Sequence, residues 1–284
     1  MKKQLFLLFT SVILFSSCSN DDNQAESIVS VSSMVRKSYN TTTGETLATT
    51  VYEISDNKIQ STHSSSSVTS DISNSVYTYS GDRLSSIENS RNGIVTSKNY
   101  LLYNSANKLV EYRTEVLNPG GAITLINKQT FTHTPNGITS QWTRSNDNGT
   151  TFSLISSTQI TLDSNDNQTF LEDYDNINNE TNQIKKIYDS NNNIVTEEFY
   201  NVENNNPILA MTNTVTYNTH KNTLSFVMEK TYGRDVLMLL YPYAGGAINN
   251  IDVKSYSPNS LNTFSTTFGE GLVTFSITNT ANAN

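Results

Sequence analysis

Two short segments of the chain have the residue types and spacing of a calcium-binding loop. Both read Asp-x-Asn-x-Asn, and their candidate ligands are Asp163, Asn165, Asn167, Asp189, Asn191 and Asn193. Calcium takes carboxylate and amide oxygens at alternate positions of such a loop, and a bidentate glutamate at the twelfth position completes it. Tyr174 and Tyr200 stand at that position here. The alternative is a recurring hairpin turn, which we favour, so we expect no metal and no cofactor.

Residues for acid–base or nucleophilic catalysis are few and scattered. The three histidines, His63, His133 and His220, are far apart, and the chain contains no Gly-x-Ser-x-Gly nucleophile elbow. The adjacent acids Glu172-Asp173 and Glu197-Glu198 suggest the carboxylate pair of a glycosidase. However, neighbours in a strand point to opposite faces, so neither pair converges by itself. We therefore predict that the protein is not an enzyme.

Aromatic side chains are the third chemical feature, with 15 tyrosines, 11 phenylalanines and one tryptophan. Aromatic faces can stack on a sugar ring, or they can pack the inner face of a curved sheet. The candidates for ligand stacking are Trp142, Tyr77, Tyr79, Tyr100 and Tyr103. Both interpretations stay open from the sequence alone.

The single cysteine, Cys18, follows a segment with the features of a signal peptide. Lys2 and Lys3 form a basic start, and Leu5 to Phe15 is an apolar run shorter than the roughly 20 residues of a membrane-spanning helix. Ser16, Ser17 and Cys18 resemble the lipobox of bacterial lipoproteins in its looser Bacteroidota form. The resemblance implies lipidation of Cys18 after removal of residues 1–17. One cysteine also excludes an intramolecular disulfide.

The residues after Cys18 indicate where the anchor would place the protein. Residues 18–27 form the lipidated end and a polar tether, and the acidic run from Ser19 to Asn23 resembles the surface-export signal of Bacteroidota lipoproteins. We expect a lipid anchor in the outer membrane with the body exposed at the cell surface. A periplasm-facing position is the alternative.

The composition favours strands and turns, and it argues against nucleic acid as a partner. Only 15% of residues are charged and the formal net charge is −8, so the chain would repel a phosphate backbone. The polar excess consists of Asn, Thr and Ser. Asn favours turns and Thr favours strands.

Turn-forming clusters recur along the chain at a nearly constant distance. Their centres lie near residues 57, 82, 107, 136, 166, 192 and 220, a spacing of roughly 25 to 30 residues. Each interval accommodates two strands of about 6–8 residues, which is one hairpin and a return loop. This pattern predicts an all-β fold over residues 28–284. The fold would be one domain with a large curved antiparallel sheet, an open barrel or spiral, built from about seven β-hairpin repeats.

The end of the chain departs from the repeats. The apolar run Val236 to Leu240 lies between Gly233 and Pro242. We expect this run to form a buried strand or a short helical turn. Residues 272–280 read as a closing strand.

A recurring unit runs from a tyrosine through a turn to a leucine or isoleucine. Examples are Tyr77 to Leu84, Tyr103 to Leu109 and Tyr188 to Ile194. The unit resembles a degenerate YD repeat, in which the Tyr-Asp pair survives only at Tyr188-Asp189. It is more similar to repeat-bearing Bacteroidota lipoproteins of unknown function with porin-like or YD-like sheets. The resemblance covers about residues 50–255, and it implies a fold but no activity.

These observations predict a cell-envelope lipoprotein that acts as a non-enzymatic β-repeat scaffold or binding module. Its partners would be the membrane, through the N-terminal lipid, and a glycan or a protein. The alternative is a carbohydrate-binding or carbohydrate-processing accessory protein at the surface. A concave aromatic cleft flanked by two convergent carboxylates would favour the carbohydrate alternative, whereas a packed tyrosine stripe with no cleft would favour the scaffold.

Overall fold

One antiparallel sheet makes up most of the computed structural model, which describes residues 31–39, 44–135, 137–221, 223–240, 259–268 and 271–276. Its sixteen strands follow one another in chain order. They are β1 (Ser33–Tyr39), β2 (Thr46–Ser55), β3 (Lys58–Ser66), β4 (Ile72–Ser80), β5 (Arg83–Arg91), β6 (Ile94–Tyr103), β7 (Leu109–Leu117), β8 (Ile123–Thr134), β9 (Gly137–Ser145), β10 (Ser153–Leu162), β11 (Gln168–Asp175), β12 (Glu180–Tyr188), β13 (Ile194–Glu203), β14 (Asn206–Lys221), β15 (Asn259–Phe268) and β16 (Gly271–Ser276). The predicted all-β repeat fold is confirmed.

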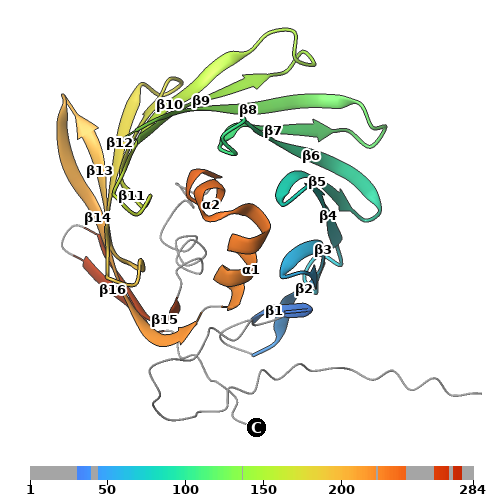
Figure 1. Cartoon of the computed structure of the whole chain (residues 1–284), viewed down its shortest axis with the longest axis horizontal. Helices are drawn as coiled ribbons and strands as arrows, with labels where there is room; N and C mark the ends of the chain where they lie inside the picture. Colours follow the sequence, from blue (N-terminus) through green and yellow to red (C-terminus); the bar gives the residue numbers. More distant parts are fainter. Residues whose placement is uncertain are drawn as a thin grey trace, which may run out of the picture.

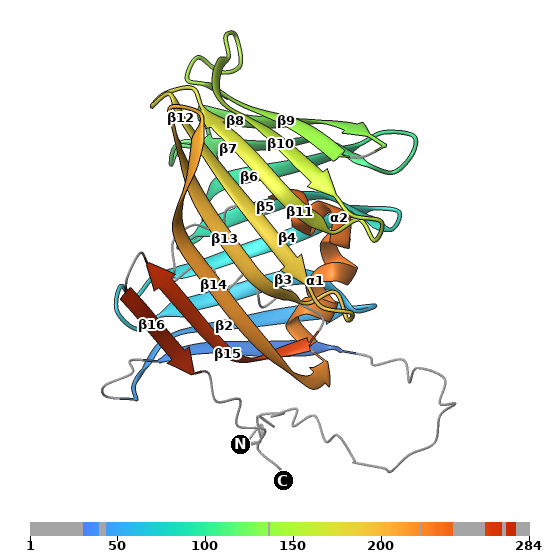
Figure 2. The same cartoon turned by 90° about the vertical axis from the view of Figure 1, so that its left-hand side faces the viewer.

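The sheet curls into an incomplete ring around two helices (Figure 1). Within the described residues, β1 pairs with β2 and β16 pairs with β15, and no ladder joins the two ends. Figure 2 shows the strands running obliquely across the wall. A sheet with this many twisted strands must curl or split, and here it curls and stays open.

Five of the seven predicted hairpin turns are confirmed, and each has a residue with positive φ, namely Asn57, Gly81, Asn107, Asp166 and Asn192. The turn predicted near residue 136 lies outside the described residues. The turn predicted near residue 220 is wrong, because the long strand β14 continues to Lys221. Glycine and asparagine adopt this left-handed conformation at low cost. The register also shifts beside most of these turns, as at Thr78/Tyr79 and Ile187/Tyr188. Such β-bulges bend the strand and increase its twist, which contributes to the curl of the sheet.

The strands place a belt of aliphatic residues on the inner face of the sheet, near these turns. The fully buried members include Ile59, Leu84, Leu109 and Leu171, with Ile184 only 3% exposed. The same cluster contains six residues from the helices: Val227, Met228, Tyr232, Val236, Leu237 and Leu239. The hydrophobic core therefore lies between the inner face of the sheet and the helices.

The helices α1 (Thr223–Tyr232) and α2 (Arg234–Leu240) form a tight pair inside the ring (Figure 1). Gly233 separates them with φ of 85°, and its amide bonds to the Glu229 carbonyl at 2.8 Å, as expected of a glycine that ends a helix. For Val236 to Leu240, the helical alternative is confirmed. Neither α1 nor the position of both helices inside the sheet was predicted from the sequence.

The outer face of the sheet is largely polar and carries charge pairs. Lys98 Nζ of β6 lies 2.9 Å from Glu88 Oε2 of β5, and within β7 Arg113 Nη2 lies 3.2 Å from Glu115 Oε1. Isolated apolar residues such as Leu102, which is 59% exposed, interrupt this surface. The sheet thus has a buried apolar belt on its inner face and a solvent-exposed outer face, as is common for antiparallel sheets.

We expect truncation of an inner leucine to destabilise the protein far more than truncation of an outer one. Leu84→Ala opens a cavity against the helices and should lower the free energy of unfolding by about 2–5 kcal/mol. Leu102→Ala is the control, and its effect should stay within about 0.5 kcal/mol. Urea unfolding followed by circular dichroism measures both. Equal losses would contradict the inner belt as the core.

Candidate functional site

A cavity of about 280 Å³ lies on the inner side of the sheet, beside the end of the helix pair. Its lining residues are Tyr77, Ile87, Asn89, Asn99, Tyr112, Tyr232 and Leu240. Three are tyrosines and two are asparagines, so aromatic faces and neutral hydrogen-bonding groups surround it. We call it the luminal pocket.

Strand register brings these residues together from four neighbouring strands. Tyr77 of β4 lies opposite Ile87 of β5, and Ile87 lies opposite Asn99 of β6. Asn99 in turn faces Thr114 of β7, two residues after Tyr112. Alternate residues of a strand point to the same face. Tyr112 therefore shares the inner face with the rest of the lining, and α1 adds Tyr232 from inside the ring.

Hydrogen bonds fix the two asparagines of the luminal pocket. Asn89 accepts a bond from Ser75 Oγ at 2.8 Å, and its Nδ2 donates to Ser97 Oγ at 3.0 Å. Asn99 accepts a bond from Thr114 Oγ1 through Oδ1 at 2.7 Å. Within the described part of the chain, the Nδ2 of Asn99 donates no hydrogen bond. This buried amide is a donor that a ligand in the pocket could use.

The pocket tyrosines are packed and stay uncharged at neutral pH. The rings of Tyr77 and Tyr232 meet edge to face, with centroids 6.4 Å apart and an interplanar angle of 87°. Burial raises the pKa of Tyr77, and the hydrogen bond to Tyr232 opposes this shift only in part. Burial likewise raises the pKa of Tyr112, and the neighbouring Thr114 side chain opposes this shift only in part. Each phenol is therefore present as a neutral hydrogen-bonding group.

Among the described residues, no carboxylate, histidine, lysine or arginine lines the luminal pocket. The titratable groups in this lining are the three tyrosines, and burial moves the pKa of Tyr77 and Tyr112 further above neutral. The described lining is therefore uncharged at pH 7.

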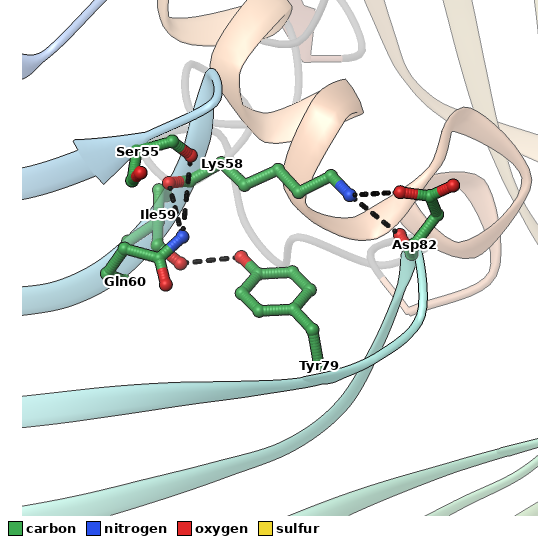
Figure 3. A network of polar contacts seen from close by, with 6 residues as sticks. All are labelled: Ser55, Lys58, Ile59, Gln60, Tyr79 and Asp82. Carbon is green, nitrogen blue, oxygen red and sulfur yellow. Dashed lines mark hydrogen bonds and ion pairs between the residues drawn. The ribbon is translucent and has the colours of Figure 1, made fainter.

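The five predicted stacking residues do not form one platform. Tyr77 lines the luminal pocket, whereas Tyr79 donates to the Ile59 carbonyl at 2.5 Å and lies under the Lys58 ammonium (Figure 3). Tyr103 also belongs to the packed inner belt, with the Arg83 guanidinium 5.3 Å from its ring centroid.

The other two candidates lie elsewhere. Tyr100 alternates with the inner residues Asn99 and Leu101, so it is on the outer face, where Arg113 stacks on it at 4.8 Å. Trp142 lies on β9 with Arg144 at 5.4 Å from its ring centroid. The sequence analysis missed Tyr112, Tyr232, Asn89 and Asn99. The alternation that places Asn99 and Tyr112 on one face is visible only once the strand pairing is known.

The two predicted calcium loops are hairpin turns in which aspartate oxygens bind the backbone. Asp163 Oδ1 accepts the amides of Asn165 and Asn167, at 2.8 and 2.9 Å. Asp189 Oδ1 does the same for Asn191 and Asn193, both at 2.9 Å. Across the described residues, no group of three or more His, Cys, Asp or Glu side chains is arranged to hold a metal ion. The carboxylates act here as turn-closing acceptors.

In each of the two adjacent acid pairs, the side chains point to opposite faces of the sheet, as the strand geometry predicts. Glu172 Oε2 accepts from Gln183, and Asp173 Oδ1 accepts from Thr158 on the other face. Glu198 accepts from the Tyr200 hydroxyl at 2.6 Å, and Glu197 accepts from Asn213 at 3.3 Å. Each acid is thus engaged locally. Cys18 lies outside the described residues.

Comparisons with known proteins show distant likenesses in fold only. No family model matches the chain, and no curated protein matches it. A porin-like protein from Bacteroides uniformis matches with 11% identity and a TM-score of 0.34, over 60% of this chain and 84% of that one. A protein of unknown function from Bacteroides fragilis matches with 12% identity and a TM-score of 0.14, over 62% and 87%.

A third similar structure is the complex TcdB2-TccC3-Cdc42, with 9% identity and a TM-score of 0.19. The match covers 65% of this chain and 13% of that one. These similarities are too weak to carry an argument about function. Separately, none of the helices in the described ranges is both long enough and apolar enough to span a membrane.

Alkaline titration should distinguish the packed inner tyrosines from exposed tyrosines. Burial raises the pKa of Tyr79 to about 12 and that of Tyr103 to about 12, against about 10 for an exposed tyrosine. Folding favours the neutral phenol, so this contribution to stability is present below pH 10 and is lost as the pH rises toward 12. Phenolate absorbance measures the titration. Replacing Tyr79 by Phe (Tyr79→Phe) should remove part of the rise in phenolate absorbance near pH 12. If the variant instead lost part of the rise near pH 10, the burial of Tyr79 would be contradicted.

Proposed function

We propose that this protein is a non-enzymatic cell-envelope lipoprotein whose rolled sheet binds a small neutral, polyhydroxylated ligand such as a sugar ring in the luminal pocket. The observation that carries the proposal is the lining of that pocket, which consists of aromatic, amide and aliphatic side chains. Aromatic faces contact the apolar face of a sugar ring, and amides and phenols bond its hydroxyls.

The size and electrostatics of the pocket support a neutral ligand. Its volume of about 280 Å³ is nearly twice that of a cavity known to take benzene. A charged ligand would lose hydration on entry without gaining an opposite charge from the lining. A neutral ring with several hydroxyls meets no such cost, since Asn99 and the pocket tyrosines offer hydrogen bonds.

Binding fits this chemistry better than carbohydrate processing. Glycoside hydrolysis by the common mechanisms requires two carboxyl groups about 5–10 Å apart on either side of the scissile bond. None of the described residues that line the luminal pocket has a carboxyl group, and the predicted acid pairs are engaged in local hydrogen bonds elsewhere on the sheet. The packed inner tyrosines also match the pattern expected of a scaffold.

The envelope location rests on the N-terminal sequence. Cys18 follows a basic start and a short apolar run, and a polar, acidic segment separates it from the sheet. Two or three acyl chains on this cysteine would hold the body firmly at the membrane, since stable anchoring takes more than one chain. The outer membrane, with the body toward the cell exterior, is the location we propose.

Sugar binding should depend on the luminal pocket and not on the outer face. Isothermal titration with glucose, galactose, N-acetylglucosamine, maltose and cellobiose should find at least one ligand in the millimolar range or tighter. Tyr112→Leu removes an aromatic face and a hydroxyl, so it should weaken binding about tenfold, or about 1.4 kcal/mol. Tyr100→Leu is the control, and its affinity should be unchanged. Absence of binding by all five sugars, or equal losses in the two variants, would overturn the proposal.

Lipidation of Cys18 is testable in a Gram-negative host. The full chain should incorporate labelled palmitate and partition into the detergent phase. Cys18→Ala removes the thiol that would carry the lipid, so the label and the detergent partitioning should both disappear. Ser17→Ala is the control and should keep both. Labelling that survives in Cys18→Ala would place the lipid elsewhere.

A further inference from the structure

A second cavity, of about 150 Å³, lies between α2 and the hairpin turns at one end of the sheet. Four segments line it, and their residues are Lys108, His133, Thr134, Pro135, Ile138, Ile160, Leu162, Asp166, Gln168, Asp235, Met238 and Leu239. None of these residues lines the luminal pocket. We call it the turn-end cavity.

Two residues of the turn-end cavity have a buried polar atom without a partner. Gln168 is 1% exposed, and its Oε1 accepts from Lys186 Nζ at 2.9 Å, but its Nε2 donates to nothing in the described part of the protein. Asp235 accepts from Arg83 Nη1 through Oδ1 at 3.1 Å, and its buried Oδ2 accepts nothing from the described residues. Buried polar atoms almost always have a partner, either protein or ordered water, so the cavity offers one donor and one acceptor to whatever fills it.

The wall formed by α2 is held in place by two arginines. Arg83 reaches from β5 to Asp235, and it also donates to the Asn107 carbonyl at 3.0 Å. Arg234 donates to Asn167 Oδ1 at 2.6 Å, and Asn167 is bonded in turn to Asn192 at 3.0 Å. These bonds tie the N-terminal end of α2 to β5 and to the turn before β11.

The remaining lining restricts the ligand to a small, mostly apolar body. Ile138, Ile160 and Leu239 are all buried and form apolar walls. A cavity of this volume takes a single six-membered ring. The charges at the cavity are balanced: Lys108 and Asp166 carry opposite charges, and Asp235 is paired with Arg83. A net charge on the ligand therefore meets no uncompensated opposite charge.

We propose that the turn-end cavity binds a small uncharged ring compound that has both a hydrogen-bond acceptor and a hydrogen-bond donor, such as a cyclic amide. The acceptor oxygen of the ligand receives the Gln168 Nε2–H, and the ligand N–H donates to Asp235 Oδ2. The ring packs against the aliphatic wall. This site is independent of the sugar proposal, since the two cavities share no residue.

The test compares three ring compounds of similar size on the folded protein. The probes are 2-piperidone, which has an acceptor and a donor, cyclohexanone, which has only an acceptor, and cyclohexane, which has neither. Heteronuclear NMR titration gives the three dissociation constants. We expect 2-piperidone to bind at least tenfold more tightly than cyclohexanone, and cyclohexane to bind most weakly. Equal affinities, or no binding by 2-piperidone, would overturn the proposal.

Two matched variants assign the effect to the unpaired atoms. Gln168→Glu keeps an oxygen for Lys186 but removes the donor, and Asp235→Asn keeps an oxygen for Arg83 but replaces the acceptor. Each should weaken 2-piperidone binding about tenfold. Met238→Trp fills the cavity from α2 and should abolish binding, whereas Tyr112→Leu at the luminal pocket should leave it unchanged. Unchanged binding in Met238→Trp would place the ligand elsewhere and overturn the proposal.

Discussion

The structure depends on side chains that satisfy backbone groups beside the β-bulges. The hydroxyl of Tyr79 donates to the carbonyl of Ile59, twenty residues earlier, and Tyr188 does the same for Gln168. Tyr217 donates to the Ile194 carbonyl at 2.7 Å. Each accepting residue is the first or second residue of a strand just after a turn. A buried carbonyl without a partner is costly, so these bonds fix each hairpin against the next.

The backbone of Ile59 is satisfied by side chains on both sides, and one of these bonds holds α1 in place. The ladder between β3 and β4 begins at Ser61, so the Ile59 peptide group is free of that pairing. Its carbonyl accepts from Tyr79, and its amide donates to Thr231 Oγ1 of α1 at 2.9 Å. Its side chain is fully buried in the core. One residue thus joins two hairpins and a helix. Both cavities border the helix pair that this arrangement positions.

The hairpin repeats were predictable because turn chemistry is local. Asn57, Asn107 and Asn192 adopt positive φ where their clusters indicated turns, and the spacing of the clusters sufficed to predict one large antiparallel sheet. The helix α1 was not predictable, because its apolar residues face a sheet whose curvature depends on many bulges. The luminal pocket was not predictable either. Asn99 and Tyr112 meet only through the pairing of β6 with β7, which local sequence does not specify.

Amide hydrogen exchange of Ile59, resolved by NMR, tests whether α1 packs inside the sheet and satisfies the backbone of β3, because this amide donates to Thr231 Oγ1 of α1. We expect exchange as slow as that of the central strand amides, and much faster exchange in Thr231→Val, which lacks the acceptor. Fast exchange of Ile59 in the unmodified protein would show that α1 does not occupy this position.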